Sequence, residues 1–252
     1  MQNKPILVIG DSCIDRFVYC HCERLCPDAT VPVLDILYRK DSAGMAGNVH
    51  RNIEALEYPV ILKCNLNSTE IVKARYVDRK SNHMFLRIDD TFQPEHCDDL
   101  QEIDFDSYSA IVISDYDKGF LSCQDINYIG SRHPLTFLDT KKILGDWAKT
   151  MTFIKINRKE YRLSFPYLDQ DLENKIICTL GADGCSYRQV IYRVNEVEIK
   201  NLSGAGDSFL AALAVKYLES NGDIAQSLIF ANNIATIVVQ KKGISTLKDD
   251  LC

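Results

Sequence analysis

One stretch of this sequence, residues 201–208, constrains the fold more than any other. It reads NLSGAGDS and leads directly into an apolar run at 209–215 whose large side chains recur at helical spacing. Asn221 and Gly222 then supply a stop for that helix. Small residues before a helix leave its first backbone N–H groups bare, at the positive end of the helix dipole. The stretch therefore predicts an anion-binding site with the carboxylate of Asp207 inside it.

Asp207 also has an alternative interpretation, which is purely structural. An acidic residue in the first turn of a helix commonly does no more than complement the helix dipole. The stretch alone does not separate a catalytic carboxylate from such a stabilising one. The rest of the chain has to decide between them.

Composition and charge narrow the class of protein. The chain has 252 residues, of which 46% are hydrophobic, enough to bury the core of one α/β domain. Its net charge is −6, and its basic residues form no run longer than a pair, which argues against nucleic acid or an anionic membrane as partner. A small-molecule substrate agrees better with this charge distribution than nucleic acid or a membrane does. No apolar stretch reaches the roughly 20 residues of a membrane span and no signal peptide is evident, so we expect a cytoplasmic protein.

The ten cysteines are scattered along the chain, as expected for reduced thiols in packing positions. A cluster of Cys20, His21, Cys22 and Cys26 raises the alternative of a metal site. Its spacing matches no standard zinc pattern, and no second pair of ligands follows at a usual distance. Packing is the favoured interpretation.

Apolar runs that end in polar residues predict a doubly wound sheet. The run at 5–10 is a buried strand followed by a turn at 10–12, and those at 108–114 and 135–138 end in DYDKG and DTK. Ligands of such sheets sit at the carboxyl ends of the strands. This makes Asp15 and Arg16 candidates for substrate contact, although Asp15 also suits a turn or cap. Helices at 124–129 and 144–149 are the expected crossovers.

The segment at 30–38 is expected to lie outside the main sheet. Residues 30–38 are rich in β-branched side chains and contain a proline, which favours a sheet edge. Residues 43–48 contain two glycines and open a helix, where Asn48 offers a donor and an acceptor to a hydroxyl group. Runs at 60–62, 71–77 and 84–89 are strand-like, and the last two form a hairpin.

The second half of the chain supplies candidates for nucleotide binding. A strand at 153–156 leads to Asn157 and Glu160, an amide and a carboxylate able to hold a hydrated magnesium ion. A strand at 175–179 precedes a glycine-bearing turn at 180–184, and a final helix begins near Asp223. Ordinary αβ connectivity is the alternative for both pieces.

No P-loop and no dinucleotide-binding glycine motif is present. Taken in order, the motifs of this chain resemble the signatures of the ribokinase-like (PfkB) carbohydrate kinases. The resemblance covers residues 44–48, 157–160, 179–184 and 204–207. Further segments resemble the kinases that phosphorylate O1 of D-glycero-D-manno-heptose 7-phosphate in ADP-heptose synthesis; these are residues 15–17, 23–33, 86–89, 114–119 and 139–141. No second, nucleotidyltransferase domain is recognisable, so the expectation is the kinase half alone.

The resemblance implies a three-layer α/β/α fold over residues 1–252, with a mostly parallel central sheet and a small β lid formed around 16–40 and 71–90. It implies ATP and Mg²⁺ as cofactors, with a K⁺ site in many relatives. Asp207 would be the catalytic base, next to an anion hole made by the backbone of Gly204, Ala205 and Gly206. Asn157 and Glu160 would organise Mg²⁺ through water. The nucleotide would be bound by Thr179, Gly181, Gly184 and Asn232, and the sugar by Asp15, Gly44, Asn48, Arg87 and Asp89.

Lys118 and Lys141 are the candidates for a substrate phosphate, since a sugar phosphate needs cations that a plain sugar does not. Met45 replaces the second glycine of a usual pair and is expected to crowd or reshape the sugar pocket. Asn201 and Ser203 replace the usual Asp and Thr, which weakens the inference of a monovalent-cation site. The segment between 56 and 71 is shorter than in the family, so an element at the sheet edge is expected to be missing.

Three hypotheses follow from the sequence. The first is a heptose-phosphate 1-kinase, the second a kinase of another sugar or sugar phosphate, and the third a catalytically inactive binding or assembly protein of the same fold. The edge segment at 31–38 resembles the lid strand that pairs across a dimer in relatives, so a homodimer is expected.

Overall fold

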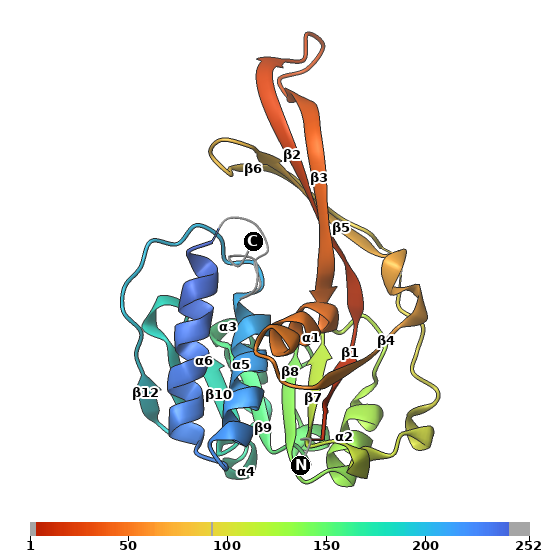
Figure 1. Ribbon diagram of the computed structural model, residues 1–252, viewed down its shortest axis with the longest axis vertical. Coiled ribbons are helices and arrows are strands. Elements are labelled where there is room, and N and C mark those ends of the chain that lie inside the picture. The colour runs from red at the N-terminus through yellow and green to blue at the C-terminus, as the bar shows by residue number, and fades with distance from the viewer. Residues whose placement is uncertain (1–3, 92, 242–252) are drawn as a thin grey trace.

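A computed structural model describes residues 4–91 and 93–241 of the chain (Figure 1). Two sheets organise them. The large sheet has eight strands in the order β12-β11-β10-β9-β8-β7-β1-β4, and the small sheet has four in the order β3-β2-β5-β6. All neighbours from β4 to β10 are parallel, and β11 and β12 add an antiparallel edge. The fold is therefore a mostly parallel α/β sheet with a small antiparallel-rich sheet, as the sequence predicts.

The large sheet consists of β1 (Ile6–Gly10), β4 (Val60–Cys64), β7 (Ala110–Asp115), β8 (Thr136–Thr140), β9 (Phe153–Asn157), β10 (Ile176–Thr179), β11 (Cys185–Tyr187) and β12 (Val190–Tyr192). The small sheet consists of β2 (Ser12–Leu25), β3 (Pro32–Met45), β5 (Val72–Asp78) and β6 (Met84–Asp89). The helices are α1 (Ala46–Ala55), α2 (Cys123–Arg132), α3 (Arg158–Ser164), α4 (Gln170–Glu173), α5 (Ala205–Glu219) and α6 (Ile224–Val239). Short 3-10 turns lie at Leu66–Thr69, Leu100–Glu102, Phe105–Ser107, Asp146–Ala148, Phe165–Tyr167 and Gly181–Asp183.

Strand β1 shows how the two faces of the large sheet are buried. Its side chains alternate between two apolar cores: Ile6 and Val8 pack on the side of α1, α5 and α6, whereas Leu7 and Ile9 pack on the side of α2 and α4. Because both faces are covered, this strand is a continuous apolar run. The result is a three-layer α/β/α body, with α5 and α6 side by side on one face (Figure 1).

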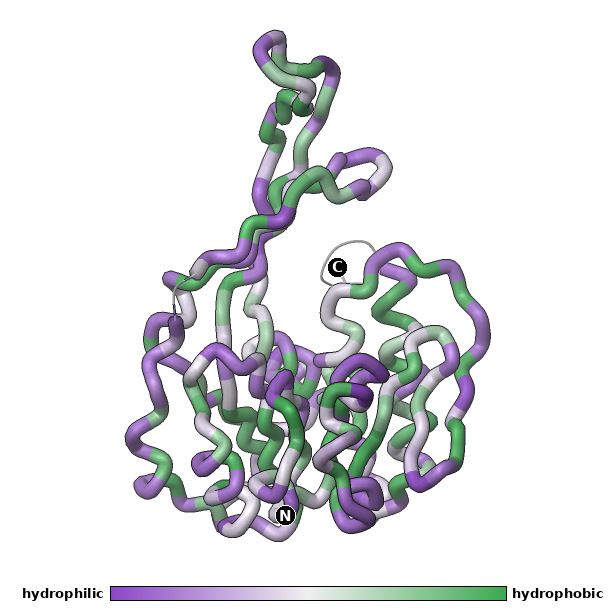
Figure 2. Tube along the Cα trace, turned by 180° about the vertical axis from the view of Figure 1, so that it is seen from behind, coloured by the Kyte–Doolittle hydropathy of each residue, from purple (hydrophilic) through white to green (hydrophobic). Residues whose placement is uncertain are grey.

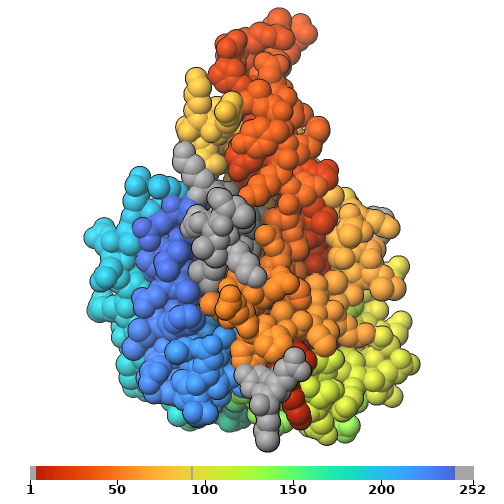
Figure 3. All heavy atoms as spheres, in the orientation of Figure 1, coloured from red at the N-terminus to blue at the C-terminus, as the bar shows by residue number. Residues whose placement is uncertain are grey.

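The small sheet rises from one end of the body, as Figures 2 and 3 show. Only Asp11 separates β1 from β2, so the turn expected at 10–12 is wrong: the chain continues from one sheet into the next. Alternate side chains of β2, including Cys13 and Phe17, are buried, which explains why this segment is extended. The edge strand expected at 30–38 is confirmed as part of β3, and the expected hairpin is β5 with β6.

Two helix predictions need correction. Helix α1 begins at Ala46, not at 43, because residues 43–45 remain paired in β3. The helix expected at 144–149 is wrong, since only the single turn Asp146–Ala148 forms. There Leu144 donates its backbone N–H to Ser164 Oγ and Gly145 is fully extended, so a helix has no room to begin earlier. The helices expected at 124–129, after 208 and after Asp223 are confirmed as α2, α5 and α6.

Candidate active site

The carboxylate of Asp207 lies in the first turn of α5 and is only 6% exposed. Gly204 precedes the helix in a left-handed conformation, with φ of 83°, which a side chain would strain. Asn48 Nδ2 donates to Asp207 Oδ2 at 2.8 Å, and the Tyr116 hydroxyl donates to Asp207 Oδ1 at 2.7 Å. Burial raises the pKa of Asp207, and these two donors act against that rise. Asp207 is therefore held by side chains from α1 and the loop after β7, which is more than a helix-dipole role requires.

A buried network of polar side chains fixes Asn48. Asn52 donates through Nδ2 to the backbone oxygen of Asn48 at 2.8 Å, and Ser208 Oγ donates to Asn52 Oδ1 at 3.1 Å. All three side chains are essentially inaccessible to solvent. Because α1 and α5 are tied together in this way, Asn48 can present its amide to Asp207 in one orientation only.

A buried ion pair lies beneath the predicted anion hole. Lys155 Nζ on β9 donates to Asp139 Oδ2 on β8 at 2.6 Å, and the two side chains are 5% and 3% exposed. A Cβ placed on Gly206 would stand 2.9 Å from Lys155 Nζ, so the ammonium group lies directly against the start of α5. The backbone N–H groups of the helix start and this positive charge together favour an anion.

The ring of Tyr116 lies between two lysines. Lys73 Nζ on β5 stands 5.2 Å from the ring centre and Lys141 Nζ stands 5.4 Å from it. Lys141 also pairs with Glu160 at 2.7 Å. Burial lowers the pKa of Lys141, but the carboxylates of Asp139 and Glu160 outweigh it and leave that pKa raised, so this lysine is a cation at neutral pH.

Lys73 is in a different situation from Lys141. Its side chain is 8% exposed, yet within residues 4–91 and 93–241 it has no hydrogen bond and no salt bridge. The carboxylates of Asp15 and Asp89 stand opposite Lys73 in the strand register, but neither forms an ion pair with it. Lys73 therefore places its amino group close to the Tyr116 ring with no direct ion-pair partner among the described residues.

Three of the predicted sugar-binding side chains, Asp15, Arg87 and Asp89, come from strands of the small sheet. Cross-strand register puts Lys73 opposite both Asp15 and Asp89, and Arg75 opposite Arg87, and side chains two apart on a strand point the same way. Asp15 accepts from Arg75 Nη1 at 2.5 Å, and Arg87 and Asp89 pair with each other at 2.7 and 2.8 Å. Since Lys73 reaches Tyr116, this charged face is turned toward Asp207.

Gly44 and Met45 lie at the junction of β3 and α1. A Cβ on Gly44 would stand 2.6 Å from Asp15 Oδ2, so the absence of a side chain there makes room for that carboxylate. Met45 has φ of 55° and ψ of −128°, a conformation that glycine adopts more readily. Its side chain packs with Cys13, Ile71 and Tyr116. Met45 thus adds an apolar wall beside Tyr116, consistent with the expectation that it reshapes the pocket.

Lys118 lies apart from these groups. Its side chain is exposed, and its recorded hydrogen bond runs from the backbone N–H to Asp11 Oδ2 at 3.3 Å. Asp11 also accepts from the N–H groups of Tyr116 and Phe120, and burial raises the pKa of Asp11. The buried carboxylate of Asp11 therefore shapes the loop that carries Tyr116, and of the two lysines predicted for a substrate phosphate the structure brings only Lys141 to that ring.

Asn157 and Glu160 form a capping box at the start of α3. Asn157 Oδ1 accepts from the N–H groups of Lys159 and Glu160, and Glu160 Oε2 accepts from the Asn157 N–H at 2.8 Å. Among the described residues no group of three or more His, Cys, Asp or Glu side chains could hold a metal ion. In the structure the two side chains thus cap α3, and the second oxygen of Glu160, Oε1, accepts from Lys141 Nζ at 2.7 Å.

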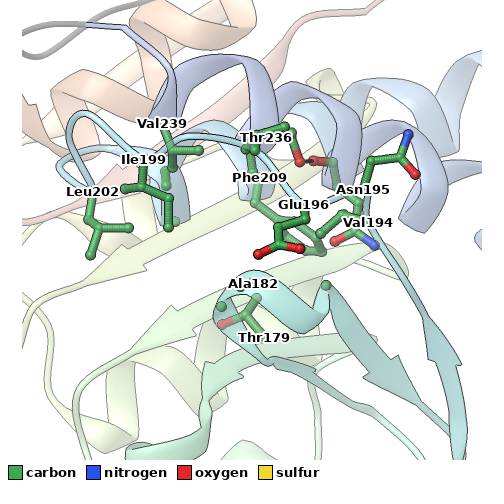
Figure 4. A pocket seen from close by; sticks show the side chains of 17 residues that line it. Thr179, Ala182, Val194, Asn195, Glu196, Ile199, Leu202, Phe209, Thr236 and Val239 are labelled. Atoms are coloured by element: carbon green, nitrogen blue, oxygen red, sulfur yellow. Dashed lines mark hydrogen bonds between the residues drawn. The ribbon is translucent and has the colours of Figure 1, made fainter.

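A cleft of about 290 Å³ opens on the α5–α6 side of the large sheet, as Figure 4 shows. The wall contains Phe209 of α5 and Thr236 of α6, with Thr179 and Ala182 across from them. All four residues predicted for the nucleotide line it: Thr179, Gly181, Gly184 and Asn232. Asn232 is itself held, because its Nδ2 donates to the Tyr192 backbone oxygen at 2.8 Å. Ala205 and Gly206 form the end of the cleft toward Asp207.

Sequence reasoning missed Tyr116, Lys73, Arg75, Asp139 and Lys155 as members of this site. Lys155 carried a usable signal, since a lysine inside the apolar run at 153–156 has to be paired when the strand is buried. Lys73 and Arg75 alternate within a strand, which indicates one polar face. Tyr116 carried no such signal, because only the three-dimensional path of its loop brings the hydroxyl to Asp207.

Part of the chain matches a known protein family. Residues 146–250 match the model of the pfkB family carbohydrate kinases. The bifunctional protein HldE of Nitratiruptor sp. is 27% identical over 96% of this chain, but the chain spans only 63% of that protein's length. The HldE protein of Helicobacter hepaticus is 28% identical, again over 96% of the chain and 61% of the relative.

Solved structures share the fold at low sequence identity. Arabidopsis thaliana ribokinase, complexed with ribose and ATP, superposes with a TM-score of 0.70 and 16% identity, covering 99% of this chain and 98% of that one. Escherichia coli phosphofructokinase-2, in complex with fructose-6-phosphate, gives a TM-score of 0.67 and 14% identity, covering 100% and 97%. No helix in the described part of the chain is both long and apolar enough to span a membrane. Over residues 146–250 this chain is thus similar to the pfkB family carbohydrate kinases, and its fold is ribokinase-like.

Proposed function

We propose that this chain transfers the terminal phosphoryl group of ATP to a hydroxyl group of a sugar phosphate, with O1 of D-glycero-D-manno-heptose 7-phosphate as the preferred acceptor. One observation carries the proposal. Asp207 lies between the apolar cleft and the ring of Tyr116, where Lys73 and Lys141 place two ammonium groups. A base with a nucleotide-sized cleft on one side and cations on the other is suited to phosphoryl transfer onto an anionic acceptor.

The reaction would use Asp207 as general base. The carboxylate accepts the proton of the acceptor hydroxyl while the oxygen–phosphorus bond forms and the bond between the terminal phosphorus and ADP breaks. Backbone N–H groups at Gly204, Ala205 and Gly206, with Lys155 behind them, would stabilise the charge on the transferred group. Asn48 and Tyr116 hold the carboxylate ready by donating to its two oxygens.

ATP would occupy the cleft between α5, α6 and the turn after β10. The apolar wall, including Phe209, suits a planar base, and Asn232 would lie beside it. Thr179, Gly181 and Gly184 would line the phosphates. Asn157 and Glu160 would hold Mg²⁺ through water, which would neutralise phosphate charge as the nucleotide binds.

The acceptor would bind under the charged face of the small sheet. Asp15, Asn48, Arg87 and Asp89 supply hydrogen-bonding groups for hydroxyls, and Gly44 leaves space for Asp15. Lys73 and Lys141 would bind the substrate phosphate, since phosphate is the anion that the unpaired Lys73 lacks. The named relatives, HldE proteins, support a heptose phosphate as the acceptor.

Residues 16–40 and 71–90 would act as a lid on a single kinase domain of 1–252. The lid exposes several large apolar side chains, more than a free sheet commonly leaves in water; these are Ile36, Leu37, Tyr38, Met84, Leu86 and Ile88. We propose that they pair with the same sheet of a second copy in a homodimer. Light scattering of the purified protein should give the mass of a dimer, and a monomeric mass at micromolar concentration would contradict it.

An ADP-release assay over a panel of acceptors tests the activity. The panel contains heptose 7-phosphate, fructose 6-phosphate and their unphosphorylated sugars. We expect turnover on heptose 7-phosphate and little on either neutral sugar. Lys73→Met should raise KM for the phosphorylated acceptor at least tenfold, while the matched variant Lys118→Met should leave it within twofold.

The outcomes of this assay separate the alternatives. Turnover on fructose 6-phosphate alone would favour a kinase of another sugar phosphate, which the unpaired Lys73 supports equally well. Equal losses in both lysine variants would remove the case for a phosphate contact at Lys73. Absence of turnover on every acceptor would favour an inactive protein of the same fold.

A further inference from the structure

A second cavity lies on the other side of the strand that borders the nucleotide cleft. It has a volume of about 430 Å³ and lies between α3, α4 and the hairpin of β11 and β12. Its apolar floor comes from alternate residues of β10 and its end, namely Ile176, Cys178 and Leu180. The residues between them turn to the opposite face, where Thr179 lines the nucleotide cleft. The two cavities thus lie back to back on one strand and the turn that follows it.

Positive charge dominates this second cavity. Three arginines line it, Arg158 and Arg162 from α3 and Arg188 from the hairpin turn, against the single carboxylate of Glu173. Glu173 accepts a hydrogen bond from the Tyr161 hydroxyl at 3.3 Å. Guanidinium groups are the side chains best suited to bind phosphate oxygens in pairs.

The donor capacity of these arginines is only partly used. Within residues 4–91 and 93–241, Arg162 makes no hydrogen bond and no salt bridge. Arg188 donates through Nε to the Asn174 backbone oxygen at 3.2 Å and stands 5.1 Å from the ring of Tyr187, which leaves its terminal nitrogens free. Each of these side chains is exposed at the cavity mouth, where an anion can reach it.

We propose that this cavity, which we term the arginine cavity, binds a small phosphorylated metabolite, with phosphate on the guanidinium groups and an uncharged part over Cys178 and Tyr161. Its volume exceeds that of a single phosphate ion, and its floor is apolar. Both features fit an organic phosphate better than an inorganic ion.

One ion pair links the arginine cavity to the nucleotide cleft. Arg158 Nη2 pairs with Asp183 Oδ2 at 2.5 Å, and Asp183 belongs to the turn Gly181–Asp183. Gly181 and Gly184 of that turn line the nucleotide cleft. An anion in the arginine cavity competes with Asp183 for Arg158 and so releases the turn. Binding at the two sites is therefore coupled, and by thermodynamic reciprocity each ligand weakens the other. This coupling rests on the proposed nucleotide role of the cleft, whereas anion binding does not.

Isothermal titration with inorganic pyrophosphate, in magnesium-free buffer, tests the site. ADP keeps the probe out of the nucleotide cleft, and it is added at a concentration at which a prior titration gives one ADP bound per chain, so that the arginine cavity stays open to the probe. We expect pyrophosphate to bind the ADP-saturated protein, and the double variant Arg162→Gln/Arg188→Gln to weaken it at least tenfold. Lys216→Gln, a surface lysine of α5 on the opposite side of the large sheet, is the matched control and should bind as the wild type does. Both arginines are exposed, so the variants should keep the thermal midpoint of the wild type, and Arg162→Gln alone should give a smaller loss.

The proposal that the arginine cavity binds phosphate would be overturned if pyrophosphate did not bind the ADP-saturated protein. It would also be overturned if the double variant bound pyrophosphate as tightly as the wild type does. The coupling has its own readout: pyrophosphate should weaken ADP binding threefold or more in the wild type and not in the double variant. Unchanged ADP affinity in the wild type would overturn the coupling. A protein that binds pyrophosphate through the arginines but fails to bind ADP would contradict the proposed kinase function and leave the arginine cavity supported.

Discussion

The hydroxyl of Tyr116 donates a hydrogen bond of 2.7 Å to Oδ1 of Asp207, although 91 positions separate the two residues in the sequence. Asp11 makes this possible, because its buried carboxylate accepts three backbone N–H groups of the loop that carries Tyr116. The base of the proposed reaction is thus positioned by a loop that a second, noncatalytic aspartate shapes.

Removing the Tyr116 hydroxyl should change the pH dependence of turnover. The donated hydrogen bond stabilises the ionised form of Asp207 and so lowers its pKa against the effect of burial. Tyr116→Phe should therefore shift the acid limb of the kcat profile to higher pH. The loss of a bond to a charged group costs roughly 1.5–3 kcal/mol, which is about ten- to a hundredfold in rate. Tyr128→Phe, a ring change on α2, is the control, and an unshifted acid limb in Tyr116→Phe would contradict the role.

Asp207→Asn should stabilise the protein at neutral pH. Burial raises the folded-state pKa of Asp207 above its ordinary value of 3.8, so the wild type loses stability as pH rises through that raised pKa. The asparagine variant lacks this penalty. In urea denaturation its advantage over the wild type should be larger at pH 7 than at pH 3.5. If the stability advantage of the variant instead grew toward acid pH, the pKa of Asp207 would be lowered in the folded state and not raised.

Lys155 and Asp139 should be strongly coupled in stability. Breaking a buried ion pair by removing one partner leaves the other charge uncompensated, at a cost of about 3–5 kcal/mol. Lys155→Met should show such a loss in urea denaturation, and the double variant Lys155→Met/Asp139→Leu should recover most of it. Turnover should stay low in both, because the ammonium group beside Gly206 is gone. Additive losses in the double variant would mean that the pair does not act as a unit.

Gly44→Ala should weaken binding of the acceptor and leave binding of the nucleotide unchanged. The new Cβ would stand 2.6 Å from Asp15 Oδ2 and 2.8 Å from Cys13 Sγ, so Asp15 has to move. We expect KM for the acceptor to rise about tenfold, the effect of a lost 1.4 kcal/mol, with ADP affinity unchanged. Gly145→Ala is the matched control, since its nearest atoms are at 3.5 Å and its backbone is extended. An unchanged KM in Gly44→Ala would remove Asp15 from the acceptor site.

The layers of the fold and the start of α5 were predictable because they follow from local patterns. Apolar runs marked the parallel strands, and small residues before an apolar helix marked the position of Asp207. Residues 10–12 were misjudged as a turn because a glycine and two small polar residues suit a turn locally. The pairing of β2 with β3 and β5 overrides that preference.

The hydrogen-bond partners of side chains were less predictable from the sequence than the places of the residues in the fold. Asn157 and Glu160 were recognisable as a pair, but their mutual capping bonds depend on the geometry of one helix start. Lys73 was predicted only as part of the strand-like run at 71–77, and its burial near Tyr116 depends on the packing of the small sheet. The resemblance assigned Asn48 to the sugar and Asp207 to catalysis, and the hydrogen bond between the two side chains was not predicted.

The most direct test of the central claim is the kcat of Asp207→Asn on the best phosphorylated acceptor, measured together with its affinity for ADP. A general base contributes about 10²- to 10⁴-fold. The account predicts a loss of at least 10²-fold in kcat with ADP affinity within twofold of the wild type. A variant that turns over near the wild-type rate would contradict the assignment of Asp207 as the base.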